Sequence, residues 1–505
     1  MIGLRFEDQP PRVISDPNRA DIACFIGFVG RRATPLPGEV GRWLYERQWI
    51  AAPDANSDLL NLPTPVDTWE VFDLLFEWEK RSLGSQDQLL PTYLGVAVRS
   101  YFAQGGRKCY VIRVDDPWPY LQAPDNRDAY IEDHMDQLLP GYSGSVIEAS
   151  PVAPKSWKGI GHLFGLTDVS FLCLPDLAEI VRNPEAKIDP KIELPPEPEQ
   201  FVECSDELPV PQDRLTPRVN APRCDETGYR AWSKAMGVCA QFLNRMQREV
   251  QLVASVPLPE TGSDAEQNLL DYLKKHVGDP LAQLPKETAT GMASAFVQLS
   301  YPWLRTSASA NLPQGLESPD GVLTGLLARN ALARGAFRSA ANLPPVDVHD
   351  LVPTLNRHQI ESLAERVSLF ALTPDGLRLV SDVTTSLQSS YRQAHVNRLL
   401  STLVRAARRL GEDALFEVSG ERLWTQIRDQ LRWLLEGFRS AGALRGESEE
   451  EAYFVRCDRS TMTQNDIDNG RVIAQIQIDP AAAIDAITVV LAMDEGGQVS
   501  LVGQV

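Results

Sequence analysis

The sequence predicts an α/β protein with more than one domain. Apolar runs of strand length alternate with segments of helical spacing over about the first half of the chain, which is the order found when helices connect the strands of one sheet. Two long amphipathic helices over 395–413 and 421–442 then precede further strands at the C-terminal end. A chain of 505 residues is long enough to build two to four cores.

The N-terminal residues predict an extended arm rather than a helix. They are polar and interrupted by prolines, which restrict the backbone and remove hydrogen-bond donors. Their apolar side chains come in short pairs, Leu4 with Phe6 and Val13 with Ile14.

Elements of alternating type follow this arm. Residues 22–30, "IACFIGFVG", predict a short buried strand that ends at glycine, and residues 91–106 predict a helix closed by a Gly-Gly stop. A proline- and glutamate-rich stretch over 180–222 cannot bury a core and predicts a surface excursion. The other expected elements are helices over 68–78 and 228–246 and strands over 109–114, 168–177 and 249–257.

The charge and composition exclude several classes of protein. The formal net charge is −19 and the acidic residues are spread along the chain, so the surface repels phosphate and we expect no nucleic-acid partner. No apolar run approaches the roughly 20 residues that span a bilayer, and the N-terminus lacks the features of a signal peptide. We therefore expect synthesis in a cytoplasm and no direct membrane insertion. The seven cysteines form no CxxC pair, which favours buried free thiols.

The stretch 453–478, "YFVRCDRSTMTQNDIDNGRVIAQIQI", is rich enough in Asp and Asn to raise the question of a metal site. An EF-hand loop that starts at Asp466 would need its glycine one residue later than Gly470 and a glutamate where Gln477 stands. The pattern fails, and a turn is the better interpretation. Thr463 and Asp466 have capping-box spacing, and Asn469-Gly470 can reverse the chain.

The strand after this turn has one apolar face. Val472, Ala474, Ile476 and Ile478 alternate with more polar positions, which is typical of a half-buried strand. The run "ITVVLAMDEGGQVSLV" near the C-terminal end predicts a hairpin turning at Gly496-Gly497. In this predicted hairpin the apolar residues include Val489, Leu491, Val499 and Leu501.

No catalytic, metal or cofactor signature stands out. The histidines show no metal-ligand spacing, and there is no phosphate-binding glycine loop or nucleophile elbow. We expect no cofactor and no enzymatic activity. The open alternative is a hydrolase housed near 115–165 or 180–222, with Asp115, His134 or His162 in its site.

One basic feature stands out in this acidic chain. Arg398, Arg405 and Arg409 fall at helical spacing on one face of the helix over 395–413. Two interpretations remain open at this point: a solvated helix face, or a docking surface for an acidic partner.

The run "YFVRCDRSTMTQNDIDNGRVIAQI" (453–476) resembles the signature near the C-terminus of contractile tail sheath proteins, which occur in phages and contractile injection systems. Further segments resemble the family in family order. They are "FIGFVG" (25–30), "YFAQGGRKCYVIRV" (101–114), "VSFLCLPDL" (169–177), "SYPWLR" (300–305), "RGAFRSAAN" (334–342) and "ERLWTQIRDQLRWLLEGFRSAGAL" (421–444).

This resemblance implies a structural function and a split, multi-domain sheath fold. Sheath subunits form hexameric rings around an inner tube, link through arms that add strands to neighbours' sheets, and contract to drive the tube through a target envelope. It implies an N-terminal arm (1–22) that joins a C-terminal domain (345–505), with an outer domain (23–344) between them and insertions near 115–165 and 180–222. The arm contacts would fall on the apolar residues named above, in the N-terminal pairs, the strand 472–478 and the terminal hairpin.

The resemblance also names partners: other sheath subunits of the same or a related kind, the inner tube protein, and baseplate or cap proteins. It places Arg398, Arg405 and Arg409 in the domain nearest the tube, where they would face an acidic tube or neighbour surface. The protein would be made in a bacterial cytoplasm and become part of a phage tail or tail-like particle.

The chain departs from the family at both ends. It begins "MIGLRFEDQPPRVISDPN" where the family has a "PGVYVEE"-like arm, and it carries an extra "DEGGQVSLVGQV" at its end. The extra strand would fold back on the chain's own sheet edge. This favours an alternative in which the chain is a terminal-row, cap or baseplate adaptor that does not itself contract.

Overall fold

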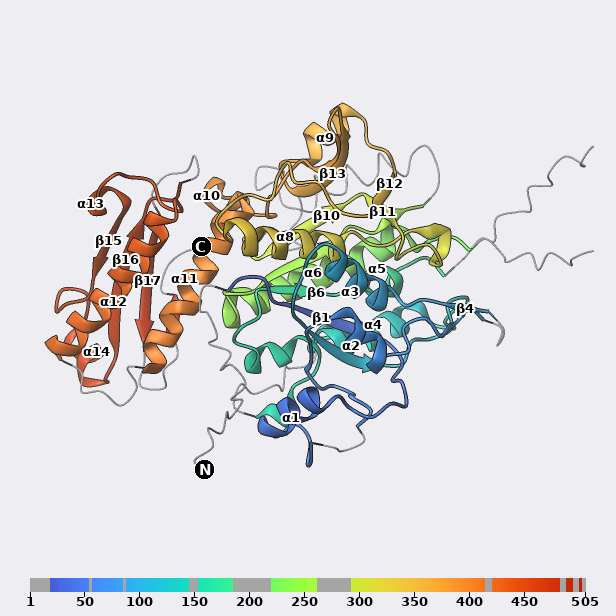
Figure 1. Cartoon of the computed structure of the whole chain (residues 1–505), viewed down its shortest axis with the longest axis horizontal. Helices are drawn as coiled ribbons and strands as arrows, with labels where there is room; N and C mark the ends of the chain where they lie inside the picture. Colours follow the sequence, from blue (N-terminus) through green and yellow to red (C-terminus); the bar gives the residue numbers. More distant parts are fainter. Residues whose placement is uncertain are drawn as a thin grey trace, which may run out of the picture.

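The computed structural model of the chain describes residues 19–53, 57–84, 88–144, 153–184, 219–260, 292–413, 420–481, 487–493 and 499–501. Two sheets organise this part of the chain, and helix α11 (Ala394–Asp413) lies between them (Figure 1). The α/β class expected from the sequence is confirmed.

The larger sheet is mostly parallel. Six neighbouring strands run the same way, and an antiparallel strand closes each edge. The spatial order is β14 (Gly376–Leu379), β13 (Val367–Thr373), β10 (Val297–Tyr301), β8 (Gln251–Ser255), β6 (Phe171–Cys173), β1 (Ala23–Phe28), β5 (Cys109–Asp115) and β2 (Thr64–Val66).

The central strands form because their sequences are nearly continuous apolar runs, as expected for strands that are covered on both faces. All six residues of β1 are buried, and so are all those of β6 and β8. The strands expected over 22–30, 109–114, 168–177 and 249–257 correspond to β1, β5, β6 and β8 and are confirmed.

Helices that were expected from spacing are also found. α2 (Trp69–Leu75), α3 (Tyr93–Ala103) and α6 (Glu226–Met246) begin at side-chain caps from Thr68, Thr92 and Asp225. α3 packs closely on α8 (Asp320–Arg334), a helix that the sequence did not single out. Other elements of this unit are α1 (Gly38–Glu46), α4 (Arg127–Leu138), α9 (Arg357–Leu363), β11 (Trp303–Thr306) and β12 (Val348–Val352).

Glycine permits the close contact between α3 and α8. A Cβ on Gly321 would come within 2.5 Å of the Ala97 carbonyl oxygen, and one on Gly325 within 2.6 Å of the Tyr101 carbonyl oxygen. Both distances are shorter than a side chain tolerates, so the two helix backbones can approach only where side chains are absent.

The second sheet has four antiparallel strands in sequence order. They are β15 (Tyr453–Arg456), β16 (Val472–Ile478), β17 (Ile487–Met493) and β18 (Val499–Leu501). The apolar stripe of α12 (Glu421–Ser440) is buried in the same core as β15 and β16, as the periodicity predicts. Two short helices, α13 (Glu449–Ala452) and α14 (Gln464–Asp468), complete this unit.

The structure corrects the expected domain boundary at 344/345. β13 and β14 belong to the larger sheet, and their buried side chains join the first core, which also includes Leu351 of β12. The second core begins at Val396 of α11. The boundary therefore lies near the start of α11, because β13 pairs with β10, a partner that local sequence does not reveal.

The described part of the insertion expected near 115–165 also differs from the expectation. Ile131, Met135 and Leu138 of α4 are buried in the first core, so this part of 115–165 is an integral layer of the outer unit. Most of 180–222 lies outside the described residues. Among the helices that are described, none combines the length and apolarity needed to cross a membrane.

Candidate functional site

The turn before β16 is built as the sequence predicts. The Thr463 hydroxyl accepts a hydrogen bond from the Asp466 backbone N–H at 3.2 Å, and the Asp466 carboxylate accepts one from the Thr463 N–H at 2.9 Å. Hydrogen bonds from Thr463 hold the pKa of Asp466 below its usual value. The capping box is confirmed, and it starts α14.

The end of the same turn depends on glycine. Gly470 has φ = +66°, whereas Asn469 caps α14 with φ = −92°. Only Gly470 therefore uses the left-handed conformation that we expected of the pair. The Thr461 hydroxyl donates to the Ile473 carbonyl at 2.7 Å, which ties the turn to β16. Together these contacts fix where β16 begins.

The apolar face of β16 is confirmed as buried, but its proposed role as an arm contact is not. Val472, Ala474, Ile476 and Ile478 are at most 5% exposed and lie in the chain's own second core. β16 is also paired on both sides, with β15 and with β17. These four residues are therefore core positions: neither their side chains nor the strand's edges are free for a neighbour.

The expected terminal hairpin forms. β17 pairs with β16 over seven residues, and β18 folds back on β17 through Leu491 with Leu501 and Met493 with Val499. The backbone positions of Val489 and Leu491 thus lie in β17, and those of Val499 and Leu501 in β18. The turn at Gly496-Gly497 and the arm residues Leu4, Phe6, Val13 and Ile14 lie outside the described residues.

β15 is one of the two edge strands of this sheet, and β18 is the other. The strand stands at one end of the sheet order, and within the described residues no strand pairs with its outer side. Tyr453 and Val455 are buried, whereas Phe454 is 44% exposed. Unpaired backbone groups beside an exposed aromatic ring form a template on which another strand can add.

Helix α11 lies at the end of the larger sheet where several parallel strands have their N-termini. The Arg405 guanidinium donates to the carbonyls of Arg19 at 2.8 Å, Val169 at 2.8 Å and Glu249 at 3.2 Å. These residues precede β1, β6 and β8, which are neighbours in the sheet. Arg408 adds an ion pair with Glu249. One arginine therefore binds carbonyl oxygens at the start of three strands.

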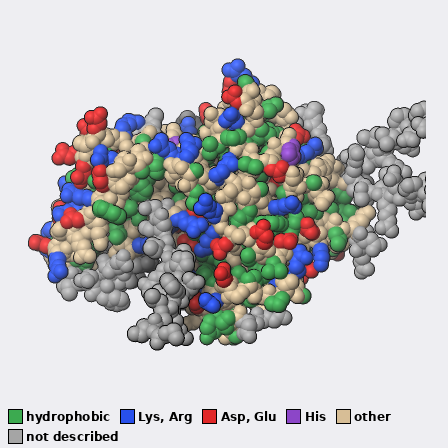
Figure 2. Space-filling model, in the orientation of Figure 1, with side chains coloured by type: hydrophobic (Ala, Val, Ile, Leu, Met, Phe, Trp, Pro, Cys, Tyr) green, Lys and Arg blue, Asp and Glu red, His purple; other side chains and the backbone are tan. Residues whose placement is uncertain are grey.

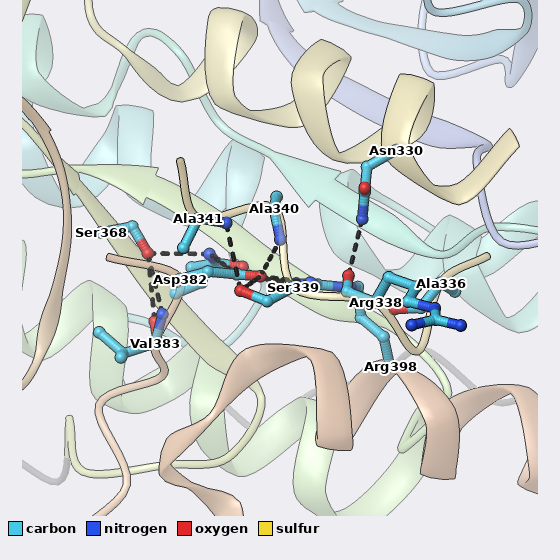
Figure 3. A network of polar contacts seen from close by, with 11 residues as sticks. Asn330, Ala336, Arg338, Ser339, Ala340, Ala341, Ser368, Asp382, Val383 and Arg398 are labelled. Atoms are coloured by element: carbon cyan, nitrogen blue, oxygen red, sulfur yellow. Dashed lines mark hydrogen bonds and ion pairs between the residues drawn. The ribbon is translucent and has the colours of Figure 1, made fainter. Parts of the chain in front are cut away.

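Arg398 makes a second set of contacts at this end of the sheet, near β10 (Figure 3). Its guanidinium donates to both carboxylate oxygens of Asp382, at 3.1 Å and 2.6 Å. Asp382 also accepts from Gln298 of β10 at 3.0 Å and from the Ala340 N–H at 2.8 Å. Burial would raise the pKa of Asp382, but the charge and hydrogen bonds of Arg398 outweigh burial and lower it.

These contacts overturn the interpretation of α11 as a docking helix. Arg398 and Arg405 are each 4% exposed and are bound inside the chain. Arg409 is half-buried and also has an interaction within the chain. The arginines recur at this spacing because buried carbonyl and carboxylate oxygens at the end of the sheet are stable only when donors such as guanidinium groups bind them. Sequence alone missed Asp382, because nothing in its local sequence links it to Arg398.

The residues of the enzyme alternative do not come together. His162 is fully buried, with Nδ1 at 3.0 Å from the Gly159 carbonyl oxygen and Nε2 at 2.8 Å from that of Asn61, and burial lowers its pKa. His134 packs edge to face with Trp118, with 4.7 Å between the ring centroids. Asp115 is exposed and accepts a hydrogen bond from the next residue's N–H. The three residues have separate structural partners.

Buried carboxylates that the sequence did not reveal lie in the larger unit. Glu317 accepts from the Ser100 hydroxyl at 2.7 Å and also contacts the Thr306 hydroxyl, and burial raises its pKa to about 8. Burial likewise raises the pKa of Asp320 to about 6 and that of Asp176 to about 7. Their partners are hydroxyl and backbone N–H groups of the same unit, so they bear on stability rather than on a reaction.

The described residues contain no group of three or more His, Cys, Asp or Glu side chains placed to hold a metal ion. The six cysteines within the described ranges are buried and free, as expected, whereas Cys204 lies outside those ranges. Figure 2 shows basic and acidic side chains interspersed over the described part of one face.

The fold of the chain is similar to that of chains in solved structures of contractile sheaths, as the sequence resemblance implies. The chain is similar to one in the cryo-EM structure of the anti-feeding prophage helical sheath in the contracted state. The TM-score is 0.52 at 19% identity, over 96% of this chain and 97% of that chain.

Two further structures give the same result. A chain of the contracted sheath complex of PVC, an extracellular contractile injection system, matches with a TM-score of 0.53 at 16% identity, over 95% of this chain and 94% of that one. A chain of the contracted anti-feeding prophage baseplate matches with a TM-score of 0.56 at 16% identity, over 96% and 97%. Neither a protein-family model nor a curated protein matches the sequence.

Proposed function

We propose that this protein is the structural sheath subunit of a contractile tail or contractile injection system. The observation that carries the proposal is the match of fold over 96% of this chain and 97% of a chain from a contracted helical sheath. Copies would stack as hexameric rings around an inner tube, and contraction would drive the tube through a target envelope. The partners are other sheath subunits, the inner tube protein and baseplate or cap proteins, and the function requires no catalysis and no cofactor.

The proposed link between copies is strand exchange at β15. Its outer side is unpaired within the described residues, and Phe454 is exposed beside it. Addition of a neighbour's strand would satisfy these backbone groups and create an interface that repeats from copy to copy. The proposed donor is the N-terminal segment with its apolar pairs Leu4/Phe6 and Val13/Ile14. In this proposal the arm joins the second core, and the outer unit reaches to α11.

A second candidate is a sheath-like subunit at the end of the particle. β18 folds back on β17 in the same chain, so the outer side of β17 is paired within the chain itself. One of the similar structures is a contracted baseplate. Such a subunit would sit in a terminal row, cap or baseplate and would not itself contract.

Electron microscopy of purified particles that carry a labelled copy of this chain separates the candidates. Label along the whole sheath supports the sheath subunit, and label at one end supports the adaptor. Particles that lack the chain altogether would overturn both.

Strand exchange has its own test by disulfide cross-linking. An Ile14→Cys, Arg456→Cys variant should form ladders of linked copies in assembled particles but none in the isolated subunit. The matched control pairs Ile14→Cys with Glu361→Cys on α9, which lies in the outer unit. Intact particles without ladders above this control would reject β15 as the exchange edge.

A further inference from the structure

An apolar groove of about 630 Å³ opens between α8, α11 and α12. Its walls include Leu332 of α8, Phe337, Leu399 of α11, and Trp433 and Leu434 of α12. Trp433 is 81% exposed and Leu332 is 40% exposed. An indole left this open to water beside other apolar side chains is the mark of a surface that binds another apolar group.

The groove is preformed because its loop wall is held in place. Arg398 donates from Nε to the Ala336 carbonyl oxygen at 3.2 Å, and Asp382 accepts from the Ala340 N–H at 2.8 Å (Figure 3). These bonds fix the loop on both sides of Phe337. A ligand would not have to order this wall, so less of the binding free energy is lost.

Basic side chains stand beside the groove. Arg334 and Arg338 flank the lining residues Gly335–Phe337, and both are exposed. Within the described residues neither forms an ion pair, and Arg338 Nη2 lies 3.2 Å from the position of a Cβ on Gly442, just beyond the end of α12. The groove therefore suits a segment that has bulky apolar residues next to carboxylates.

The chain's own N-terminal residues have that chemistry. Leu4 and Phe6 flank Arg5 and are followed by two carboxylates, Glu7 and Asp8. The segment also starts close by, since the Arg19 carbonyl is bound by Arg405, one helical turn after the lining residue Thr402. The residues between Glu7 and Arg19 span roughly 40 Å when extended, which is more than enough to reach the groove.

We propose that, in the unassembled subunit, residues 4–8 dock in this groove of their own chain. Leu4 and Phe6 would fill the apolar walls, and Glu7 and Asp8 would pair with Arg334 and Arg338. The same chain is favoured over a second copy because tethering gives the segment a millimolar effective concentration. Docking would cover Trp433 and the apolar residues of the arm until neighbours compete for the arm.

Cysteine cross-linking of the isolated full-length subunit tests the location. Under mild oxidation, Phe6→Cys with Ala441→Cys should form an intrachain disulfide at least about tenfold faster than the control pair Phe6→Cys with Glu361→Cys. Equal rates for the two pairs would overturn the proposal. Cross-linked dimers in place of an intrachain bond would show that the occupant comes from a second copy, which also overturns it.

Charge exchange tests the chemistry with a readout that a folding defect would not reproduce. In the parent, docking shields the arm from protease. Trypsin cleavage after Arg12 should therefore speed up about tenfold in Arg334→Glu, Arg338→Glu, because these changes release the arm. Adding Glu7→Lys, Asp8→Lys should restore the slow rate. Failure of this rescue in a variant with an unchanged unfolding midpoint would overturn the pairing.

Both assays use the isolated subunit, so their outcome is separate from that of the proposed sheath function. Particles can assemble normally with no docking in the free subunit. The reverse also holds, since the arm can dock in a chain that never enters a particle.

Discussion

Arg398 of α11 and Asp382, beyond the end of β14, form a buried ion pair with 2.6 Å between Nη2 and Oδ2. Their side chains are 4% and 0% exposed. Asp382 is bonded to β10 and to the loop after α8, and Arg398 lies in the helix that leads into the second core. This charge pair therefore joins the two units, together with the ion pair between Arg408 and Glu249.

Loss of this pair should destabilise the whole fold. Replacing Arg398 with methionine leaves the Asp382 carboxylate buried without its cation, which typically costs about 3–5 kcal/mol. We expect the free energy of unfolding, measured by chemical denaturation, to fall by that order. The matched control is Arg422→Met, which removes an exposed arginine from α12 and should change it by less than about 0.5 kcal/mol. Similar midpoints for the two variants would show that the pair does not hold the units together.

Glu317 should make stability fall as the pH rises. Burial raises its pKa in the folded state to about 8, whereas in the unfolded chain it titrates near 4.5. Between these values the unfolded chain loses the proton first, so the group's stabilising contribution is full below pH 4.5 and is lost as the pH rises through 8. Glu317→Gln keeps a neutral side chain and should gain up to a few kcal/mol over the parent between pH 5 and pH 8. Parallel pH profiles for the two proteins would contradict this.

Glycine at the contact between α3 and α8 should be essential for packing. In Gly325→Ala the new methyl group would lie 2.6 Å from both the Tyr101 carbonyl oxygen and the Gln104 Cβ. We expect a loss of about 1–3 kcal/mol in the free energy of unfolding. Gly437→Ala in α12 is the control, because its Cβ would meet nothing within 4 Å, and it should stabilise by about 0.5–1 kcal/mol. Effects of the same sign would refute the packing argument.

The capping box should control the turn before β16. Thr463→Ala removes the acceptor of the Asp466 N–H and should cost about 1 kcal/mol locally. Amide hydrogen exchange should then speed up about fivefold in 464–470, with little change in the core of β16. Thr425→Ala, which changes a solvent-exposed residue within α12 and away from the turn, should leave exchange in 464–470 unchanged. Unaltered exchange in the Thr463 variant would mean that the turn is held by other contacts.

Local sequence was enough to predict the features that depend on neighbouring residues. The continuous apolar runs of β1, β5, β6 and β8 predict buried strands, and the alternation from Val472 to Ile478 predicts a strand with one buried face. The spacing of Thr463 and Asp466 predicts the capping box. The strands depend on side-chain periodicity, and the capping box depends on hydrogen bonds over three or four residues. Both kinds of pattern can be recognised from neighbouring residues in the sequence.

Only the tertiary structure decided what these elements pair with. An amphipathic helix with regularly spaced arginines has the same pattern whether those arginines meet water, a partner or a buried edge of oxygens. In α11 the ligands of Arg405 are carbonyls from residues 19, 169 and 249, and the ligand of Arg398 is Asp382. The pairing of β13 with β10, which moves the domain boundary to α11, is likewise long-range. Such contacts are fixed by strand order and burial, because a buried cation is stable only where distant parts of the chain bring acceptors to it.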